Sequence, residues 1–401
     1  MQKYDVVIIG GGVVGLGTAL ALSENKKIKI KVIEAEKELA AHQTGNNSGV
    51  IHSGLYYKPG SLKARNCVEG REQLYRFCKE HDIAYDNCGK LVVAVTDDEI
   101  PGLKKLYERG QKNNLKGLKW LEGKEINEYE PHVNGIAALL VPETGIVNYK
   151  DVTDKYAEIV RANGHEVETG CAFSGLHRNS DGLIVQTNRG DLHTKYLINC
   201  GGLQSDRIAK KCGVEPGLKI IPFRGEYYKL KAEKYHLVKN LIYPVPDPEF
   251  PFLGVHFTRM IEGGVEAGPN AVLAFKREGY SKFSFSLKDT IETFTYPGFI
   301  KLAGQYMSMG MHEFYRSYVK SAFVKALQRL IPEITGDDIV AGGAGIRAQA
   351  LERNGLLTDD FRIVETEDMI HVLNAPSPAA TASISIGRTI SQMAEKNFDL
   401  N

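Results

Sequence analysis

YDVVIIGGGVVG, residues 4–15, is the stretch that decides the fold of this chain. An apolar run, typical of a buried parallel strand, leads into the spacing G-x-G-x-x-G and then into helical periodicity. Gly10 allows a tight turn, Gly12 lets a pyrophosphate approach the backbone, and Gly15 lets helix and strand pack closely. Glu34 follows the next apolar run, 24 residues after Gly10, where a carboxylate binds ribose hydroxyls. These features predict a βαβ unit that binds a dinucleotide.

Composition and charge exclude other classes of protein. The 401 residues are 43% hydrophobic and 25% charged, as in an ordinary globular protein, and the net charge of +1 gives no indication of a nucleic-acid partner. The six cysteines form no C-x-x-C pair and no zinc-like spacing with histidine, so we expect free thiols, no metal site and a reducing, cytoplasmic location. The uncharged run 6–22 is broken by glycines and changes its periodicity, so we do not interpret it as a membrane span.

Further patterns place the chain in the α/β class, with an α+β organisation overall. Apolar runs and turn residues predict strands, and amphipathic spacing predicts helices. The expected strands cover 28–33, 89–96, 196–200, 369–374 and much of 220–285, and the expected helices cover 61–81, 152–162 and most of 286–332. Dinucleotide-like segments therefore occur at the start, middle and end of the chain, with mixed β segments between them. This order predicts a Rossmann-like domain interleaved with a mixed-sheet domain.

The dinucleotide is predicted to be FAD. The glycine motif alone does not separate FAD from NAD, because both share the adenosine half. The loop 40–54, AAHQTGNNSGVIHSG, is rich in small polar residues where the flavin end of an extended FAD would run. Residues 374–381 place a second helix start near the ligand, and its N–H groups favour negative charge on a reduced flavin. The predicted FAD contacts are Gly10, Gly12, Gly15, Glu34, Thr44, Asn47, Ser48, Gly49, Gly201, Gly202, Ser377, Ala379, Ala380 and Thr381.

Several long stretches resemble one family closely. NNSGVIHSGLYYKPGSLKA (46–64), GPNAVLAFKREGY (268–280), AGIRAQAL (344–351) and NAPSPAATASI (374–384) resemble the L-2-hydroxyglutarate dehydrogenase/oxidase family, within the D-amino-acid-oxidase-like flavoproteins. The resemblance implies FAD-dependent oxidation of L-2-hydroxyglutarate, a dicarboxylate, to 2-oxoglutarate. It also implies a discontinuous FAD-binding domain with a substrate-binding domain over the flavin ring. We assign 1–85, 146–215 and 338–401 to the first domain, and 86–145 and 216–337 to the second.

Other activities stay open on the sequence. Related flavoenzymes oxidise another 2-hydroxy acid, an amino acid or glycerol 3-phosphate, and a flavin-binding electron-relay module without turnover is a different class. The resemblance implies transfer of electrons to a quinone or to O2. Contact with a membrane would then be peripheral, at the inner membrane face, because no basic amphipathic helix is evident in the sequence.

The catalytic residues expected are two histidines and one arginine. Oxidation of a secondary alcohol requires a base for the hydroxyl proton, and imidazole has a pKa near neutrality. His52 lies in the predicted flavin-lining loop, and His256 lies in a strand of the substrate domain. Arg347 resembles the superfamily arginine that pairs with the substrate carboxylate, which a guanidinium binds with two hydrogen bonds. Tyr56, Tyr57, Arg224 and Lys276 are candidates for the second carboxylate.

One departure from the superfamily concerns attachment of the cofactor. Covalent members often carry a histidine just before the small-small-Gly turn, and this chain has Asn46 there. An amide does not form the flavin bond, although His42 and His52 lie nearby in the sequence. We therefore expect non-covalent FAD.

Overall fold

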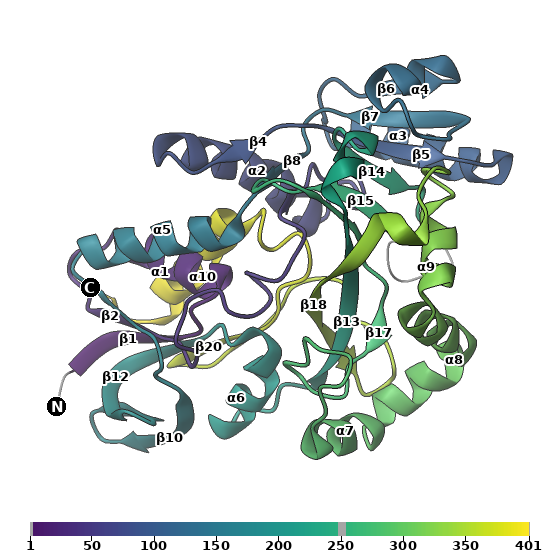
Figure 1. Cartoon of the computed structure of the whole chain (residues 1–401). Helices are drawn as coiled ribbons and strands as arrows, with labels where there is room; N and C mark the ends of the chain where they lie inside the picture. Colours follow the sequence, from purple (N-terminus) through teal and green to yellow (C-terminus); the bar gives the residue numbers. More distant parts are fainter. Residues whose placement is uncertain (1–2, 248–253, 401) are drawn as a thin grey trace.

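The computed structural model describes residues 3–247 and 254–400, whose strands form three sheets (Figure 1). In the first sheet β1 pairs in parallel with β2 and β12, and β12 pairs in parallel with β20. This arrangement confirms the predicted Rossmann-like fold around the glycine-rich turn. The strands of the first sheet are β1 (Lys3–Ile9), β2 (Ile30–Ile33), β9 (Glu166–Glu168), β10 (Phe173–Asn179), β11 (Gly182–Thr187), β12 (Gly190–Asn199), β19 (Arg362–Glu365) and β20 (Met369–Asn374).

Helices cover both faces of this first sheet. Apolar residues of α1, α2, α5 and α10 form one core with β1 and β2, and residues of α6 form a second core with the other face of β1. A Cβ on Gly387 would lie 2.2 Å from the carbonyl oxygen of Gly17, so the two glycines allow α10 and α1 to touch. These helices are α1 (Val13–Leu22), α2 (Leu62–Glu80), α5 (Tyr149–Ala162), α6 (Ser205–Lys211) and α10 (Ser383–Asn397).

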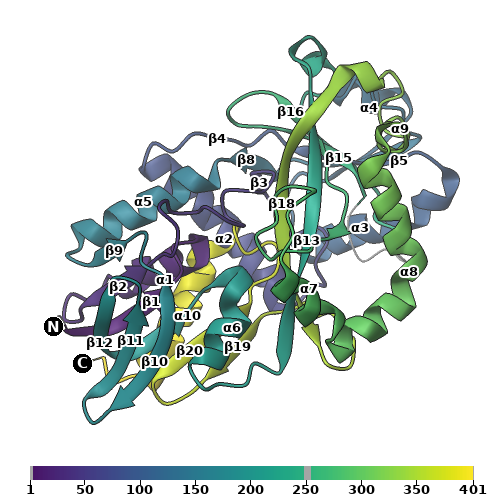
Figure 2. The same ribbon diagram turned by 60° about the horizontal axis from the view of Figure 1, so that its bottom comes forward.

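The second sheet has the order β17-β13-β16-β15-β14-β5-β7-β6, with β18 paired to β13. Figure 2 shows β13 and β18 as two long neighbouring arrows, and their antiparallel register places Phe223 opposite Arg347. The strands are β5 (Lys90–Ala94), β6 (Lys119–Glu122), β7 (Ala137–Val141), β13 (Leu218–Leu230), β14 (Leu241–Pro244), β15 (His256–Arg259), β16 (Val265–Gly268), β17 (Val272–Leu273) and β18 (Ile339–Glu352).

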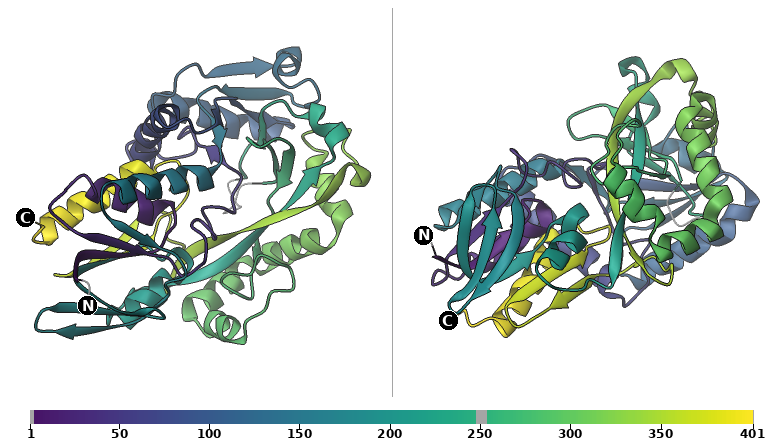
Figure 3. Two further views of the ribbon diagram at one scale, coloured as in Figure 1. Left: turned by 60° about the vertical axis from the view of Figure 1, so that its left-hand side comes forward. Right: turned by 90° about the horizontal axis from the view of Figure 1, so that it is seen from below.

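The two faces of the second sheet differ in chemistry. Leu91, Ile242 and Phe257 pack in a core with residues of α9 (Lys320–Leu327), whereas Val92, Leu241 and Tyr243 at the alternate positions belong to a different core. The alternate positions therefore point to the opposite face, as the strand period of two requires. Figure 3 shows α7 (Leu287–Phe294) and α8 (Pro297–Tyr318) on the outer side of the long strands, away from the first sheet. The inner face is free to form a site with the dinucleotide-binding turn.

Smaller elements connect the two large sheets. β3 (Val50–Ile51), β4 (Tyr85–Asp86) and β8 (Gly145–Val147) form a three-stranded sheet, and α3 (Ile100–Lys112) and α4 (Lys124–Tyr129) lie beside the second sheet. Short 3-10 turns cover Asp97–Glu99, Gly202–Gln204, Ala232–Leu237 and Gly336–Asp338. Within 3–247 and 254–400, every helix is too short or too polar to cross a bilayer.

Two details differ from the sequence analysis. The second strand begins at Ile30 instead of residue 28, because the Lys29 N–H donates to the side chain of Asp5. The expected domain division placed 338–401 with the dinucleotide-binding segments, but β18 hydrogen-bonds with β13 in the second sheet. The helices expected within 286–332 are present as α7, α8 and α9.

Candidate active site

A cavity of about 1700 Å³ lies between the glycine-rich turn of the first sheet and the inner face of the second. It exceeds an ordinary small-molecule pocket, which is about 300–1,000 Å³, as a site for a dinucleotide and a second ligand must. Most predicted site residues line it: Gly10, Gly12, Glu34, Thr44, Asn47, Ser48, His52, Tyr56, Tyr57, Gly201, Gly202, Arg224, His256, Arg347, Ser377, Ala379, Ala380 and Thr381. Gly15, Gly49 and Lys276 are not among the lining residues.

The glycine-rich turn is shaped to receive a phosphate-linked ligand. Gly10 has a φ of +115°, a conformation that L side chains rarely adopt, and a Cβ there would lie 2.4 Å from the Cys200 carbonyl oxygen. A Cβ on Gly15 would lie 2.0 Å from the Gly10 carbonyl oxygen, so Gly15 allows helix α1 to pack on the turn without itself facing the cavity. The N-terminus of α1 is thereby brought to the cavity wall, where its dipole favours an anion.

Glu34 lies at the end of β2 on the wall of the cavity. Its Oε2 accepts a hydrogen bond of 2.6 Å from the Gly11 N–H, and its Oε1 accepts one of 2.9 Å from the Glu36 N–H. These bonds fix the carboxylate beside the turn and leave lone pairs for further donors. The carboxylate is therefore held on the cavity wall beside the turn.

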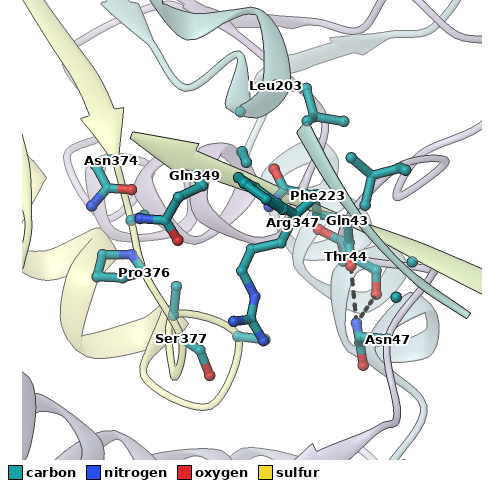
Figure 4. Close-up of a pocket in the computed structure, with 18 of the residues that line it drawn as sticks. Gln43, Thr44, Asn47, Leu203, Phe223, Arg347, Gln349, Asn374, Pro376 and Ser377 are labelled. Atoms are coloured by element: carbon teal, nitrogen blue, oxygen red, sulfur yellow. Dashed lines mark hydrogen bonds between the residues drawn. The ribbon is translucent and has the colours of Figure 1, made fainter. Parts of the chain in front are cut away.

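The loop 40–54 is held by its own side chains. The Thr44 hydroxyl oxygen accepts from the Val13 N–H at 3.1 Å, and Asn47 donates to the carbonyl oxygens of Gln43 and Thr44 at 3.1 and 2.6 Å (Figure 4). A Cβ on Gly49 would lie 2.6 Å from the Val147 carbonyl oxygen, which explains the glycine without a ligand contact. Thr44 and Asn47 thus shape the wall, whereas Ser48 lines it without a hydrogen bond that would define such a role.

The C-terminal loop closes the cavity from the side of α10. The Thr381 hydroxyl accepts from the His52 N–H at 3.1 Å and lies 3.0 Å from the Tyr149 hydroxyl. Thr381 therefore connects this loop to the segment that carries His52. Figure 4 shows the Arg347 side chain extending from β18 toward the loop at Ser377.

Polar side chains of the second sheet form the opposite wall. Arg347, Tyr227, His256 and Tyr243 come from β18, β13, β15 and β14, and all four line the cavity. Arg347 is exposed and lines the cavity from the inner sheet face. A guanidinium remains charged at any physiological pH, so it can bind a carboxylate here.

The two predicted histidines are both uncharged near neutral pH. Burial, reinforced by the nearby cations Lys90, Lys63 and Arg347, lowers the pKa of His52 to about 3. Burial lowers the pKa of His256 to about 4, and the same cations Lys90 and Arg347 contribute. A neutral imidazole can accept a proton, as a general base must.

The hydrogen bonding of His256 also defines its tautomer. Its Nδ1 lies 2.8 Å from the Gly254 carbonyl oxygen, which can only accept, so Nδ1 carries the proton and Nε2 is the acceptor. The ring stacks on Tyr243, with 3.9 Å between the ring centroids. His52 is instead positioned through its backbone, by the bond from its N–H to Thr381.

The four candidates for a second carboxylate lie in different environments. Tyr56 and Tyr57 line the cavity, and the Tyr56 hydroxyl is buried without a hydrogen-bond partner among the described residues. Arg224 also lines the cavity but donates to Glu226 at 2.8 and 3.0 Å, which compensates its charge. Lys276 is exposed outside the cavity. Of the four candidates, Tyr56 therefore has a hydroxyl without a hydrogen-bond partner among the described residues.

Three residues near the site were missed in the sequence analysis. Lys90 is 1% exposed and lies against the rings of Tyr56 and Tyr243. Tyr227 and Tyr243 line the cavity from β13 and β14. The sequence feature that could have indicated Lys90 is its place directly before the apolar run 91–95. A lysine at a strand end is ordinarily solvent-exposed, so this feature did not indicate a buried amine.

Asn46 and His42 lie near the expected flavin end. Asn46 donates to the carbonyl oxygens of Ala41 and His42 at 2.9 and 2.8 Å. The His42 ring nitrogens lie 3.2 Å from Glu36 and 3.3 Å from the Tyr280 hydroxyl, so both have partners within the protein. These contacts within the protein account for His42 without a bond to the flavin.

Comparison with known proteins connects this geometry to a family. The FAD dependent oxidoreductase family matches residues 5–393. L-2-hydroxyglutarate dehydrogenase of Indibacter alkaliphilus is 54% identical over 99% of this chain and 100% of its own. The chain belongs to the L-2-hydroxyglutarate dehydrogenase family of FAD-dependent oxidoreductases. Other members of this family are the human mitochondrial protein, 46% identical over 100% of this chain and 90% of its own, and that of Escherichia coli, 45% identical over 96% and 92%.

Solved structures show the same fold at greater distance. L-alpha-glycerophosphate oxidase of Mycoplasma pneumoniae, with FAD bound, has a TM-score of 0.79 at 23% identity, covering 98% of this chain and 95% of its own. Glycine oxidase of Geobacillus kaustophilus has a TM-score of 0.72 at 16% identity, covering 100% and 96%. The fold of the L-2-hydroxyglutarate dehydrogenase family is thus the one found in these oxidases.

The residues present fit the FAD that the family implies. The cavity combines a glycine turn, a helix N-terminus and the fixed carboxylate of Glu34 at one end with cationic and imidazole groups at the other. In addition, the Thr358 and Tyr56 hydroxyls on its wall are buried without a partner among the described residues. These are donors and acceptors that a polar ligand would satisfy.

Proposed function

We propose that this chain binds FAD non-covalently and oxidises L-2-hydroxyglutarate to 2-oxoglutarate. The observation that carries the proposal is that Arg347, His52 and His256 face the same cavity as the glycine-rich turn. A carboxylate-binding cation and a neutral base next to a dinucleotide site suit oxidation of a 2-hydroxy acid. The names of the family members identify which 2-hydroxy acid to expect.

Each residue has a defined role in this proposal. FAD, held by the glycine turn, Glu34 and the loops at 40–54 and 374–381, supplies the hydride acceptor. Arg347 binds the carboxylate next to the reacting carbon through its planar pair of N–H donors. His52 accepts the hydroxyl proton, with Nε2 of His256 as the alternative acceptor. Tyr56 donates its free hydroxyl to the second carboxylate, assisted by Tyr57.

A panel of substrates tests the proposal. The purified protein is given both enantiomers of 2-hydroxyglutarate, shorter 2-hydroxy acids, amino acids and glycerol 3-phosphate, with an artificial dye as electron acceptor. We expect the L enantiomer of 2-hydroxyglutarate to give the highest kcat/KM by at least about tenfold, because an unsatisfied second-carboxylate site costs more than about 1.4 kcal/mol. A higher kcat/KM for an amino acid or glycerol 3-phosphate would overturn the substrate assignment.

We further propose peripheral membrane contact and a quinone acceptor, with O2 as the alternative. Ten of the fifteen exposed large hydrophobic side chains of the described residues lie between 283 and 318. They include Phe283, at 87% exposed, and they recur on one side of α7 and of α8 at helical spacing. We name this set the 283–318 patch: Phe283, Phe285, Leu287, Ile291, Phe294, Ile300, Met307, Met311, Tyr315 and Tyr318. Concentrated exposed apolar groups are typical of an interaction surface.

Charge favours an anionic lipid surface as the occupant. The exposed charged residues between 281 and 320 are Lys288, Lys301 and Lys320. The acidic residues in this segment are buried or half-buried and pair with arginines: Asp289 and Glu292 with Arg207, and Glu313 with Arg316. Outward lysines around apolar side chains match the amphipathic pattern of helices that lie in a bilayer interface.

Sedimentation with vesicles tests this contact. We expect the holoenzyme to bind vesicles of phosphatidylglycerol and phosphatidylethanolamine more than vesicles of phosphatidylcholine. Ile291→Glu with Met311→Glu should abolish binding, whereas Ile136→Glu, at an exposed apolar position outside the patch, should not. Absence of binding, or self-association through the patch in place of binding, would contradict the proposal. Turnover that forms hydrogen peroxide at the same rate with and without a soluble quinone would assign O2 as acceptor.

A further inference from the structure

Lys90 is a buried amine with no carboxylate partner. It begins β5, is 1% exposed, and its ammonium lies 4.4 Å from the ring centroid of Tyr56 and 4.8 Å from that of Tyr243. No ion pair joins it to an acidic side chain within 3–247 and 254–400. The faces of two tyrosine rings therefore provide its electrostatic stabilisation.

A buried ammonium without a carboxylate partner destabilises the folded state. An isolated buried charge is strongly disfavoured, and aromatic faces offset only about 0.5–2 kcal/mol each. The nearest thiol provides no counter-charge, because burial raises the pKa of Cys67 to about 12 and keeps it protonated. An apolar side chain of equal length would fit this position at lower free energy, so the retained amine points to a role in the site.

The sheet places Lys90 against the Tyr243 ring on which His256 also stacks. β14 lies between β5 and β15, so the ring of Tyr243 separates Lys90 from His256, which stacks on that ring at 3.9 Å. Among the cations that lower the pKa of His52, Lys90 has the largest effect, ahead of Lys63 and Arg347. The charged groups that act on the two imidazoles are thus all cationic.

We propose that Lys90 is a positioning residue for proton transfer, whose charge adds to the effect of burial in keeping His52 and His256 unprotonated and able to accept the substrate's hydroxyl proton. Lys90 does not line the cavity, so it acts through the imidazoles and not by contact with substrate. The proposal rests on the proposed function in one respect, which is that oxidation of the alcohol requires a base.

The direction of titration agrees with this role. Burial lowers the pKa of Lys90 to about 7, so the ammonium is charged mainly below neutrality. That is the range in which an ordinary imidazole, with a pKa of about 6.5, would become protonated. The groups facing Lys90 are Tyr56, Tyr243 and Cys67, and none of them carries a negative charge in this range. Lys90 therefore opposes imidazole protonation at the pH where protonation would stop the reaction.

Two readouts on the holoenzyme test the proposal. The first is the pH profile of anaerobic flavin reduction by substrate, and the second is NMR titration of ¹³C-labelled imidazoles, assigned with His52→Gln and His256→Gln. In Lys90→Met we expect the acid limb and the imidazole midpoint of at least one histidine to move up by about one pH unit. Lys90→Arg, which retains the charge, should restore the wild-type positions. Lys31→Met, which removes a buried lysine that pairs with Glu166 and Glu168 in the first sheet, should leave both unchanged.

Unchanged acid limb and midpoints in Lys90→Met would overturn the proposal. If that variant does not fold, the wild-type titration decides: a midpoint near 6.5 for both histidines means that they are not held unprotonated. The NMR readout requires no substrate, so failure of the proposed oxidation would appear in the kinetic arm alone. The two failures are therefore distinguishable.

Discussion

The imidazole of His256 stacks on the ring of Tyr243, with 3.9 Å between the centroids and 29° between the planes. Together with the 2.8 Å contact between Nδ1 and the Gly254 carbonyl oxygen, this stacking fixes the ring from two sides. Among the described residues, the hydrogen bonds of His52 involve its backbone N–H and carbonyl oxygen, so its ring has no comparable restraint. His256 is thus the more fixed of the two imidazoles. We propose His52 as the base and Nε2 of His256 as the alternative, and variants of the two residues distinguish them.

We expect His52→Ala to slow anaerobic flavin reduction by about 10²–10⁴-fold, the usual contribution of general base catalysis. His256→Ala should reduce it less, because another group still takes the proton. Stopped-flow absorbance measures both. A wild-type rate in His52→Ala would assign the proton to His256 or to a bound water.

The pH dependence of the same step follows from the pKa values of the two histidines. The base must be neutral, and an imidazole is neutral above its pKa, which burial lowers to about 3 in His52 and about 4 in His256. The reduction rate should therefore stay level from pH 8 down to about 5 and fall only below that. A fall with a midpoint near 6.5 would show that the acting histidine has an ordinary pKa.

Arg347→Lys should retain the fold and the flavin but weaken substrate binding by about 10- to 150-fold. Lysine preserves the charge but not the planar pair of donors, and a hydrogen bond to a charged group contributes about 1.5–3 kcal/mol. The measurement is the Kd from flavin spectral changes with a non-reacting dicarboxylate such as glutarate. Arg259→Lys, at an arginine that pairs with Asp86 away from the cavity, is the control. Equal affinity in both variants would show that Arg347 does not hold a carboxylate.

Glu34→Ala should weaken retention of FAD by at least about tenfold, since the carboxylate fixes the turn and is the proposed ribose contact. Glu38→Ala, an exposed residue of the following loop that pairs with Lys150, should retain it fully. Equilibrium dialysis gives the Kd of FAD for each. In the wild type, acid precipitation should release the flavin into the supernatant, and flavin that stays with the pellet would show a covalent bond.

Lys90→Met should raise the thermal stability at pH 7. The pKa of Lys90 is lowered from 10.5 to about 7 in the folded state, so below pH 7 both states are protonated and the full penalty, on the order of 5 kcal/mol, is present. Between pH 7 and 10.5 only the unfolded state keeps the proton, so the penalty shrinks as pH rises. The Tm difference between Lys90→Met and wild type should therefore decrease from pH 7 to 10. A Lys90→Met variant with a lower Tm than wild type at pH 7 would contradict the claim that the buried amine destabilises the folded state.

Much of the site could be predicted because local chemistry determines it. The G-x-G-x-x-G spacing and Glu34 fixed the adenosine end, since turn geometry and strand length leave little freedom there. Arg347, His52 and His256 were found through resemblance, and the structure brings all three to one cavity. Lys90 and Tyr243 were missed, because their meeting depends on the parallel pairing of β5 with β14, strands about 150 residues apart in sequence. Gly49 and Lys276 looked like site residues, but one serves packing and the other lies outside the cavity.

The domain division illustrates the same limit. Residues 369–374 were expected to form a strand and 339–352 were not assigned to one; in the structure β18 pairs with β13 and β20 pairs with β12. Sequence pattern identifies a strand but not its partner, because pairing is set by contacts far along the chain.

Anaerobic titration with L-2-hydroxyglutarate tests the central claim most directly. The account predicts that each equivalent of the L enantiomer bleaches one equivalent of bound flavin and forms one equivalent of 2-oxoglutarate, whereas the D enantiomer leaves the flavin oxidised. Oxidised flavin after excess L-2-hydroxyglutarate, in protein that retains FAD and its fold, would contradict the account.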